Sequence, residues 1–234
     1  MRLDKFLSMY MDKSRRQLKA IIKSTGVDVN RTIIRDGSSH INPIEDDIVF
    51  LGQTFIYRDP LMIMMNKPSG VLSVTKDEKR RTAIDLIGSE YPRFSLHIAG
   101  RLDIDVEGFL LLTNDGSIVH DIISPKKHID KTYIATLDRK LKNPMVLLEG
   151  VRIRDGKNKP YLAKAKHIEW LHGRTYKLTI DEGKHHQVKR MFLHEGATTK
   201  HLKRIAIGGL MLDDELDIGK YRMLKQEEIK RVIG

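Results

Sequence analysis

The stretch GRLDIDVEGFLLLTNDG, residues 100–116, places an arginine and two aspartates ahead of a run of leucines. The apolar run FLLLT is typical of a buried strand, and NDG at 114–116 is a strong tight-turn signal. The segment before the strand is then a loop at the edge of a sheet, where reactive side chains often lie. The charged residues of this loop are Arg101, Asp103, Asp105 and Glu107.

The carboxylates of this loop allow two interpretations. Spacing alone favours acids that cap turns or pair with surface cations. Two carboxylates two residues apart, Asp103 and Asp105, also permit a glycosidase-like acid and nucleophile pair. The spacing does not fix how far apart they lie in space, so both interpretations stay open at this point.

Short strand candidates surround this stretch and alternate with a few helical ones. The strand candidates are LMIMM (61–65), FLLLT (109–113), TYIATL (132–137), YLAKAKHIEW (161–170) and TYKLTI (175–180). The helical candidates are TAIDLIGSEY (82–91) and HHQVKRMFLHEG (185–196). This alternation predicts an α+β fold with a mostly antiparallel mixed β-sheet flanked by helices.

The composition limits the classes of function. Forty-two Lys and Arg against thirty-one Asp and Glu give a formal charge of +11 over 234 residues, which favours a polyanionic partner such as nucleic acid. Cysteine is absent, which excludes a disulfide framework and a thiol nucleophile. The apolar runs are too short to cross a bilayer and the N-terminus has no signal-peptide core, so we expect a cytoplasmic protein without membrane contact.

The first fifty residues predict a separate small module. Leu3, Phe6, Leu7 and Tyr10 recur at the spacing of a short amphipathic helix. A second helix, SRRQLKAIIKST, follows with Ser14 as its N-cap and ends before a glycine. Three strand-like pieces then complete the module, in VDVN, TIIRDG and INPIEDDIVFLG.

The second helix carries a cationic face. At 100° per residue, Arg15, Arg16, Lys19 and Lys23 share one arc, roughly opposite the arc of the apolar residues. A solvated surface explains such a face in an isolated helix. Because no interleaved acids interrupt this face, it also has the arrangement that follows a phosphate backbone.

Two further segments have the residue types of a site. In KTYIATL, Lys131 and Tyr133 lie on one face of a strand, where a tyrosine is usually a core residue with an accessible hydroxyl. His185 and His186 raise the possibility of a metal. Adjacent side chains diverge on a helix and the chain has neither HExxH nor cysteine, so we predict no metal site.

Taken in order, these stretches resemble known RNA-binding and RNA-modifying units. RLDKFL, SRRQLKAII, GVDVN and EDDIVF together resemble the S4 RNA-binding domain, although this chain has Val29-Asn30-Arg31 where that family usually reads Val-Asn-Gly. MNKPSGV (65–71), the opening stretch, KTYIATL and LTIDEGKHHQVKRMF (178–192) are similar to the four motifs of the RsuA family of pseudouridine synthases. HLKRIAIGGLML and GKYRML resemble that family's C-terminal run. We therefore expect an S4-like domain at 1–55 and a catalytic domain at 60–234, joined near GQTFIYRDP.

The resemblance implies roles for single residues. Asp103 matches the catalytic aspartate, and Arg101 the arginine that helps to hold the target nucleotide out of its helix. Tyr133 matches the tyrosine that stacks on the uracil, and Lys189 the basic residue that pairs with the aspartate, ahead of Arg190. The family commonly has Thr where this chain has Val106. The residues expected to bind RNA are Arg2, Lys5, Arg15, Arg16, Lys19, Lys23, Lys67 and Arg190.

The implied reaction breaks the C1′–N1 bond of a uridine and forms a C1′–C5 bond to the same base, so we expect no cofactor. In a dry pocket a carboxylate tends to keep its proton, and a cation such as Lys189 opposes this. The expected substrate is a flipped-out uridine in ribosomal RNA, preferentially 16S, bound by a monomer. The alternatives are the same reaction on 23S rRNA, a non-catalytic ribosome assembly factor, and a hydrolase using Asp103 and Asp105.

Overall fold

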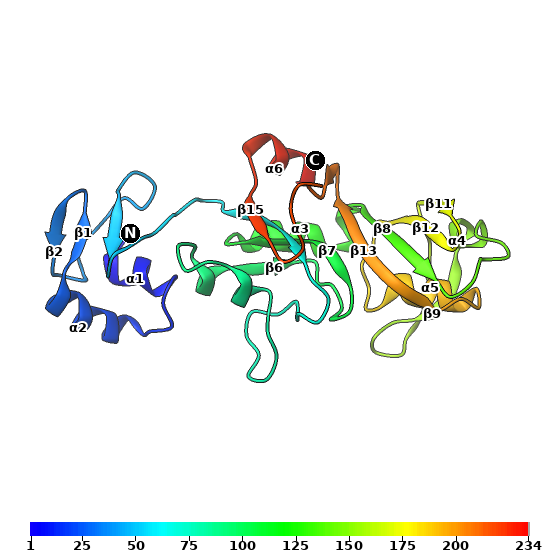
Figure 1. The fold of residues 1–234 in the computed structure, drawn as a ribbon, viewed down its shortest axis with the longest axis horizontal. Coiled ribbons are helices and arrows are strands. Elements are labelled where there is room, and N and C mark those ends of the chain that lie inside the picture. Colours follow the sequence, from blue (N-terminus) through cyan, green and yellow to red (C-terminus); the bar gives the residue numbers. More distant parts are fainter. Residues whose placement is uncertain (234) are drawn as a thin grey trace.

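The computed structural model describes residues 1–233 and has an elongated shape (Figure 1). A small N-terminal unit lies at one end, and a large β-sheet extends through the rest of the molecule. The unit has two helices, α1 (Leu3–Ser8) and α2 (Arg15–Thr25). Its four-stranded sheet has the order β2-β1-β3-β4, from β1 (Val27–Val29), β2 (Thr32–Ile34), β3 (Ile48–Phe50) and β4 (Gln53–Thr54).

Local signals in the sequence account for the helices of this unit. Ser14 caps α2, and its side chain and that of Gln17 bond to each other's backbone N–H groups in a capping box. Gly26 ends the helix with a positive φ of 79°, which glycine tolerates best. Leu18 and Ile22 of α2 pack with the apolar face of α1 in one buried cluster, which also includes Phe50.

The β1–β2 hairpin forms although Arg31 replaces the usual glycine. Val29 pairs with Thr32, so the turn consists of Asn30 and Arg31, both with positive φ (53° and 65°). The Asn30 side chain donates to the Asp46 carboxylate at 2.9 Å and accepts from the backbone N–H of Asp47 at 2.9 Å. These two bonds hold a backbone conformation that a non-glycine residue seldom adopts.

Within residues 1–233, nine strands form the large sheet, with the main order β11-β12-β8-β13-β7-β5-β15. Strands β13 and β7 run parallel and the other pairs of neighbouring strands run antiparallel, as predicted for a mostly antiparallel mixed sheet. The strands are β5 (Met62–Lys67), β6 (His97–Ala99), β7 (Glu107–Thr113), β8 (Lys131–Leu137), β11 (His167–His172), β12 (Thr175–Ile180), β13 (Thr199–Ile207), β14 (Leu210–Met211) and β15 (Tyr221–Met223).

Helices and a small hairpin complete this domain. The hairpin pairs β9 (Val151–Arg154) with β10 (Pro160–Ala163). The α-helices are α3 (Gly116–Ile123), α4 (Val146–Glu149), α5 (Gln187–His194) and α6 (Gln226–Ile233). Short 3₁₀ turns occur at Ile84–Leu86, Arg93–Ser95 and Pro125–Lys127.

Both faces of the central strand β7 are buried, which explains its continuous apolar sequence. Leu110 and Leu112 belong to the core that includes Phe192 of α5. Phe109 and Leu111 belong to a second core with residues of α3 and α6. The prediction of a buried strand at FLLLT is confirmed, and the loop before it is held between two packed layers.

Two local predictions are wrong. Residues 82–91 form no α-helix: only a 3₁₀ turn occurs at Ile84–Leu86, beside a bond from the Thr82 hydroxyl to the Asp85 carboxylate at 2.9 Å. The Gly88 N–H donates to the Tyr221 hydroxyl at 2.7 Å instead of continuing a helix. NDG at 114–116 is no hairpin turn, because Asp115 caps α3 by accepting from the Ser117 N–H at 2.8 Å. A glycine or NDG signal marks the end of one element without fixing the type of the next element.

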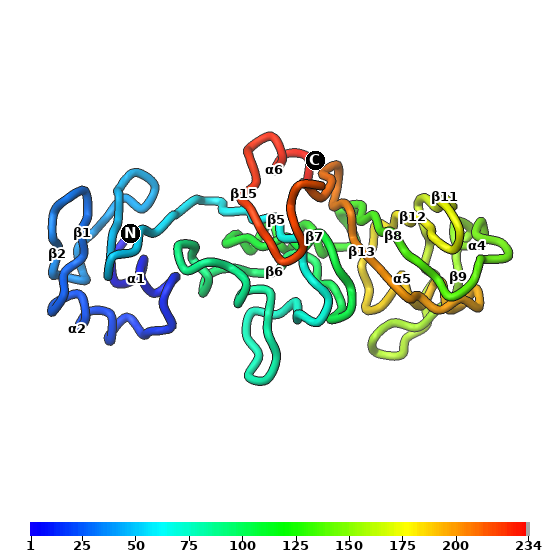
Figure 2. The backbone as a smooth tube through the Cα atoms, viewed as in Figure 1, coloured from blue at the N-terminus to red at the C-terminus, as the bar shows by residue number. Residues whose placement is uncertain are grey.

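The N-terminal unit extends into the segment predicted as the linker, residues 52–60. Strand β4 belongs to the N-terminal sheet, and Phe55 and Tyr57 pack into the N-terminal core. Beyond them an extended segment leads to β5 (Figure 2). The domain boundary between residues 55 and 60 stays a prediction. No helix in the described part of the chain combines the length and apolar character needed to span a bilayer.

Candidate active site

Arg204 of β13 fixes both ends of the loop that carries Asp103. Its side chain is 2% exposed. Nε donates to the Phe109 carbonyl at 2.7 Å, and Nη2 donates to the Gly100 carbonyl at 2.7 Å. Gly108 lies opposite Arg204 in the strand pairing, and a Cβ there would collide with the Arg204 backbone. The glycine therefore allows β7 and β13 to approach closely.

Lys67, at the end of β5, fixes the middle of the same loop. Its side chain is fully buried, and Nζ donates to the carbonyls of Pro68 (2.8 Å), Ile104 (3.4 Å) and Val106 (2.9 Å). Burial lowers the pKa of Lys67 to about 8. The prediction that Lys67 binds RNA is wrong, because its ammonium group is enclosed by backbone carbonyls of the protein.

Further backbone contacts complete the loop. The Gly70 N–H donates to the Ile104 carbonyl at 2.7 Å, and the Leu102 N–H donates to the Ser73 hydroxyl at 3.2 Å. The Val106 N–H donates to the Asp103 carbonyl at 3.1 Å, while its side chain is buried in the core. Backbone bonds thus close the loop at Val106, where the related family commonly has a threonine hydroxyl.

Two side chains that carry or can carry positive charge, Lys189 and His186, lie close to Asp103. Lys189 Nζ of α5 lies 3.2 Å from Asp103 Oδ2 and 2.6 Å from Asp105 Oδ1. His186 Nε2 lies 3.3 Å from the other Asp103 oxygen, Oδ1. The hydrogen bond from Lys189 holds the pKa of Asp105 below its usual range, against an opposing effect of burial. Asp105 therefore has a specific partner and is more than a turn residue.

Tyr133 lies on the buried face of β8, where the residue is 7% exposed. Across the sheet it pairs with Arg204 of β13, which in turn pairs with Gly108 of β7. This row of three strands places Tyr133 about 10 Å, two strand spacings, from the strand that follows the Asp103 loop. Within the described residues its hydroxyl has no hydrogen-bond partner.

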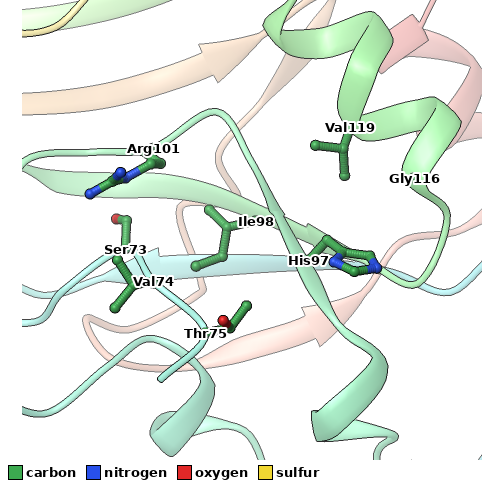
Figure 3. A pocket seen from close by; sticks show the side chains of 8 residues that line it. All are labelled: Ser73, Val74, Thr75, His97, Ile98, Arg101, Gly116 and Val119. Carbon is green, nitrogen blue, oxygen red and sulfur yellow. The ribbon is translucent and has the colours of Figure 1, made fainter. Parts of the chain in front are cut away.

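Arg101 is exposed and lines a pocket of about 430 Å³. Figure 3 shows Arg101 and His97 at opposite ends of this pocket, with Ile98 between them. Apolar side chains such as Val74 and Val119 and the hydroxyls of Ser73 and Thr75 complete the lining. Asp103 and its neighbours Lys189 and His186 are not part of the lining, so the pocket does not contain them.

The remaining predicted cations lie in two places. Arg190 donates to the Arg154 carbonyl at 2.6 Å, which joins α5 to the β9–β10 hairpin. Lys5, Arg16 and Lys23 are exposed on the N-terminal unit. Arg2, Arg15 and Lys19 share that surface but lie 3.0, 2.8 and 3.9 Å from the buried carboxylate of Asp4.

The sequence predicted a cationic helix face without acids. In the structure, the buried carboxylate of Asp4 pairs with three of the cations expected to bind RNA. Burial opposes its ionisation, but hydrogen bonds from Arg2 and Arg15 outweigh this and hold the pKa of Asp4 below its usual range. The carboxylate comes from α1, which is why the pattern of α2 alone did not reveal it.

No group of three or more His, Cys, Asp or Glu residues that could hold a metal ion occurs between residues 1 and 233. His185 and His186 stack on each other with ring centroids 3.7 Å apart and do not converge on a common point.

Sequence comparisons identify the family. The family described as RNA pseudouridylate synthase matches residues 61–194, and the S4 domain matches residues 1–48. The chain belongs to the RNA pseudouridylate synthase family. It has an N-terminal S4 domain, as the sequence motifs predicted.

Relatives of this pseudouridine synthase align over its whole length. It is 42% identical to the uncharacterized RNA pseudouridine synthase YtzG of Bacillus subtilis, over 98% of this chain and 97% of the relative. It is 36% identical to the ribosomal small subunit pseudouridine synthase A of Escherichia coli K12, over all of both chains. A crystal structure of a pseudouridylate synthase covers 100% of both chains with 36% identity and a TM-score of 0.66.

The structural roles of three residues at this synthase site were not predicted from the sequence. Arg204, Lys67 as a buried anchor, and His186 as a neighbour of Asp103 all depend on contacts between segments far apart in the chain. One signal was present for Lys67: it ends an otherwise apolar strand, where a cation requires buried partners.

Proposed function

We propose that this synthase isomerises a uridine of small-subunit ribosomal RNA, with Asp103 as the group that acts at C1′. The observation that carries the proposal is the setting of Asp103. Its side chain is 22% exposed and lies within 3.3 Å of Lys189 and His186, on a loop held through its backbone by Lys67 and Arg204. A carboxylate held in a fixed position can act on charge that develops at C1′ without first reorganising.

The proposed steps require no oxidant and no external group. The C1′–N1 bond breaks, uracil turns while it is held at the Asp103 site, and C5 bonds to C1′; the proton of C5 leaves and N1 gains one. The Asp103 carboxylate serves either as the nucleophile at C1′ or as the base that removes the C2′ proton. In the first route the ester to C1′ is broken again when C5 attacks. In the second route Asp103 returns the proton to C2′ as C5 bonds to C1′.

Tyr133 and Arg101 take supporting roles in this proposal. The buried ring of Tyr133 provides a flat surface against which a uracil can stack, and its unbonded hydroxyl can relay the C5 proton. In this proposal Arg101, whose exposed side chain lines the pocket, contacts the RNA from which the nucleotide is flipped.

The substrate part of the proposal rests on the relatives and on the surface charge. The Escherichia coli relative is named for the small ribosomal subunit, and the S4 domain presents Arg16 and Lys23 to solvent. Their cationic helix face suits a phosphate backbone. We further propose that the protein acts as a monomer in the cytoplasm, where ribosomal subunits are assembled.

The test uses unmodified 16S and 23S transcripts and partly assembled subunits, each incubated with the purified protein. Pseudouridine is located by carbodiimide treatment and primer extension. We expect one modified position in 16S rRNA, free or in the subunit. Modification of 23S rRNA alone would overturn the small-subunit assignment, and no modification of any substrate would overturn the proposed function.

A further inference from the structure

His186 has a backbone conformation that requires an explanation. It is the N-cap of α5 with φ 54° and ψ 26°, the left-handed region that residues with a side chain seldom adopt. Its side chain does not cap the helix. The cost of this conformation is therefore not offset by a capping bond.

The surrounding turn shows how the conformation is maintained. The Gln187 N–H donates to the Lys184 carbonyl at 3.0 Å, and the Lys184 N–H donates to the Gln187 side chain at 3.1 Å. This tight turn directs the His186 ring toward the Asp103 loop, where Nε2 lies 3.3 Å from Asp103 Oδ1. Strained backbone at a site often orients a functional side chain.

Lys189 alone leaves one side of the Asp103 carboxylate without a partner. Its ammonium group approaches Oδ2 at 3.2 Å, but its shorter contact, 2.6 Å, is with Asp105. His186 is the side chain at the other oxygen, Oδ1. The two residues together therefore define the plane of the carboxylate, which one shared ammonium group cannot do.

The two neighbours of Asp103 differ in charge. Burial, opposed by the Asp103 charge and reinforced by His185, Lys189 and Arg190, lowers the pKa of His186. A neutral imidazole can donate from Nε2 without adding a second positive charge beside the carboxylate. Lys189 thus supplies charge and His186 supplies direction.

We propose that His186 is a positioning residue for the reaction: its Nε2–H donates to Asp103 Oδ1 and holds the other oxygen of the carboxylate toward the sugar of the bound uridine. The inference rests on the proposed function of Asp103. At 3.3 Å, Nε2 lies within reach of Oδ1, and hydrogen bonds at active sites are commonly longer without substrate than with it.

His185 provides a matched control. It is the neighbouring histidine and stacks on His186, but it packs against Gly156 at the tip of the β9–β10 hairpin. The variants are His186→Ala, His186→Gln and His185→Ala. A glutamine amide can place an N–H donor close to the position of Nε2, whereas alanine cannot.

The experiment measures single-turnover rates and RNA affinity with the 16S transcript. We expect His186→Ala to lower the rate at saturating RNA about tenfold to a hundredfold, with RNA affinity changed less than threefold. His186→Gln restores most of the rate, and His185→Ala stays within threefold of the parent. An unchanged rate in His186→Ala, or an equal loss in His185→Ala, would overturn the proposal.

A second measurement does not depend on activity. Nitrogen-15 NMR of the ring nitrogens reports which one of His186 carries the proton in the free protein, with His186→Gln identifying the signal. We expect the Nε2–H tautomer at pH 7.5; the Nδ1–H tautomer would overturn the proposal. If the parent makes no pseudouridine but the Nε2–H tautomer is found, the proposed function fails while the contact to Asp103 stands.

Discussion

Replacing Lys67 with methionine tests whether this lysine supports the Asp103 loop or contacts RNA. The structure assigns Lys67 to the loop of Asp103, since its ammonium group is buried and donates to three backbone carbonyls. Methionine keeps the length and apolar part of the side chain and removes the donors. The loop then loses its central support, whereas no group that contacts RNA is lost.

Two opposing terms set the effect on stability. All three carbonyls lose the Lys67 donor, but that of Ile104 keeps its bond from the Gly70 N–H. The loss at the carbonyls of Pro68 and Val106 costs about 1–3 kcal/mol each. Burying the charge lowers the pKa from 10.5 to about 8. This penalty, about 3 kcal/mol at pH 7, is relieved in the variant. The net loss at pH 7 is therefore small, within about 3 kcal/mol.

The effect on activity is larger. A displacement of about 1 Å at a reacting group costs on the order of a hundredfold in rate. We expect Lys67→Met to lower the single-turnover rate by about that factor, with RNA affinity within threefold of the parent in a filter-binding assay. A fall in affinity with an unchanged rate at saturating RNA would refute the reasoning and restore Lys67 as an RNA contact.

The pH dependence of stability gives an independent check. The folded-state pKa of Lys67 is lowered, so between pH 8 and pH 10.5 the unfolded chain binds more protons here than the folded chain. The stability contribution of this residue therefore rises with pH across that window. Urea unfolding should show the rise in the parent and not in Lys67→Met; parallel curves would contradict the assignment.

Three further results are expected. Asp4→Asn should lower stability at pH 7 by about 1–3 kcal/mol in urea unfolding, because the buried partner of Arg2 and Arg15 loses its charge. Since the pKa of Asp4 is lowered, the difference should shrink as pH falls below about 4; a difference that grows there would contradict this. Glu228→Gln should cost about 1–2 kcal/mol above pH 4.5, fading toward pH 2, because hydrogen bonds from Arg222 lower the pKa of Glu228 to about 2; no change in acid unfolding would contradict it. The double variant Arg16→Ala, Lys23→Ala should reduce the salt dependence of RNA affinity by about two phosphate contacts and leave the rate at saturating RNA unchanged; an unaltered salt slope would remove this face from the interface.

Local patterns predicted the framework of the fold. The apolar run of β7, the amphipathic spacing of α1 and α5, and the cap at Ser14 all depend on residues within a few positions of each other. The helix predicted at residues 82–91 is wrong because the prediction used only local spacing. The Gly88 N–H is bonded to Tyr221 of β15, which lies far along the chain. A non-local partner decided the local structure.

The residues of the site also differ in whether local sequence could predict their roles. The positions of Asp103 and Lys189 followed from motifs, and the structure brings them within 3.2 Å. The roles of Lys67 and Arg204 in holding the Asp103 loop could not be predicted from motifs. A lysine or arginine in a strand resembles a surface cation until the loop that covers it is known. Lys67 and Arg204 are therefore visible only when β5, β7 and β13 are in place.

The most direct test of the central claim compares Asp103→Asn with Asp105→Asn in pseudouridine formation on the 16S transcript. Both substitutions remove one carboxylate from the neighbourhood of Lys189, but only Asp103 also contacts His186. We predict that Asp103→Asn forms no pseudouridine while still binding RNA, and that Asp105→Asn keeps activity within tenfold of the parent. Full activity in Asp103→Asn, or its loss only in Asp105→Asn, would contradict the assignment of Asp103 as the reacting carboxylate.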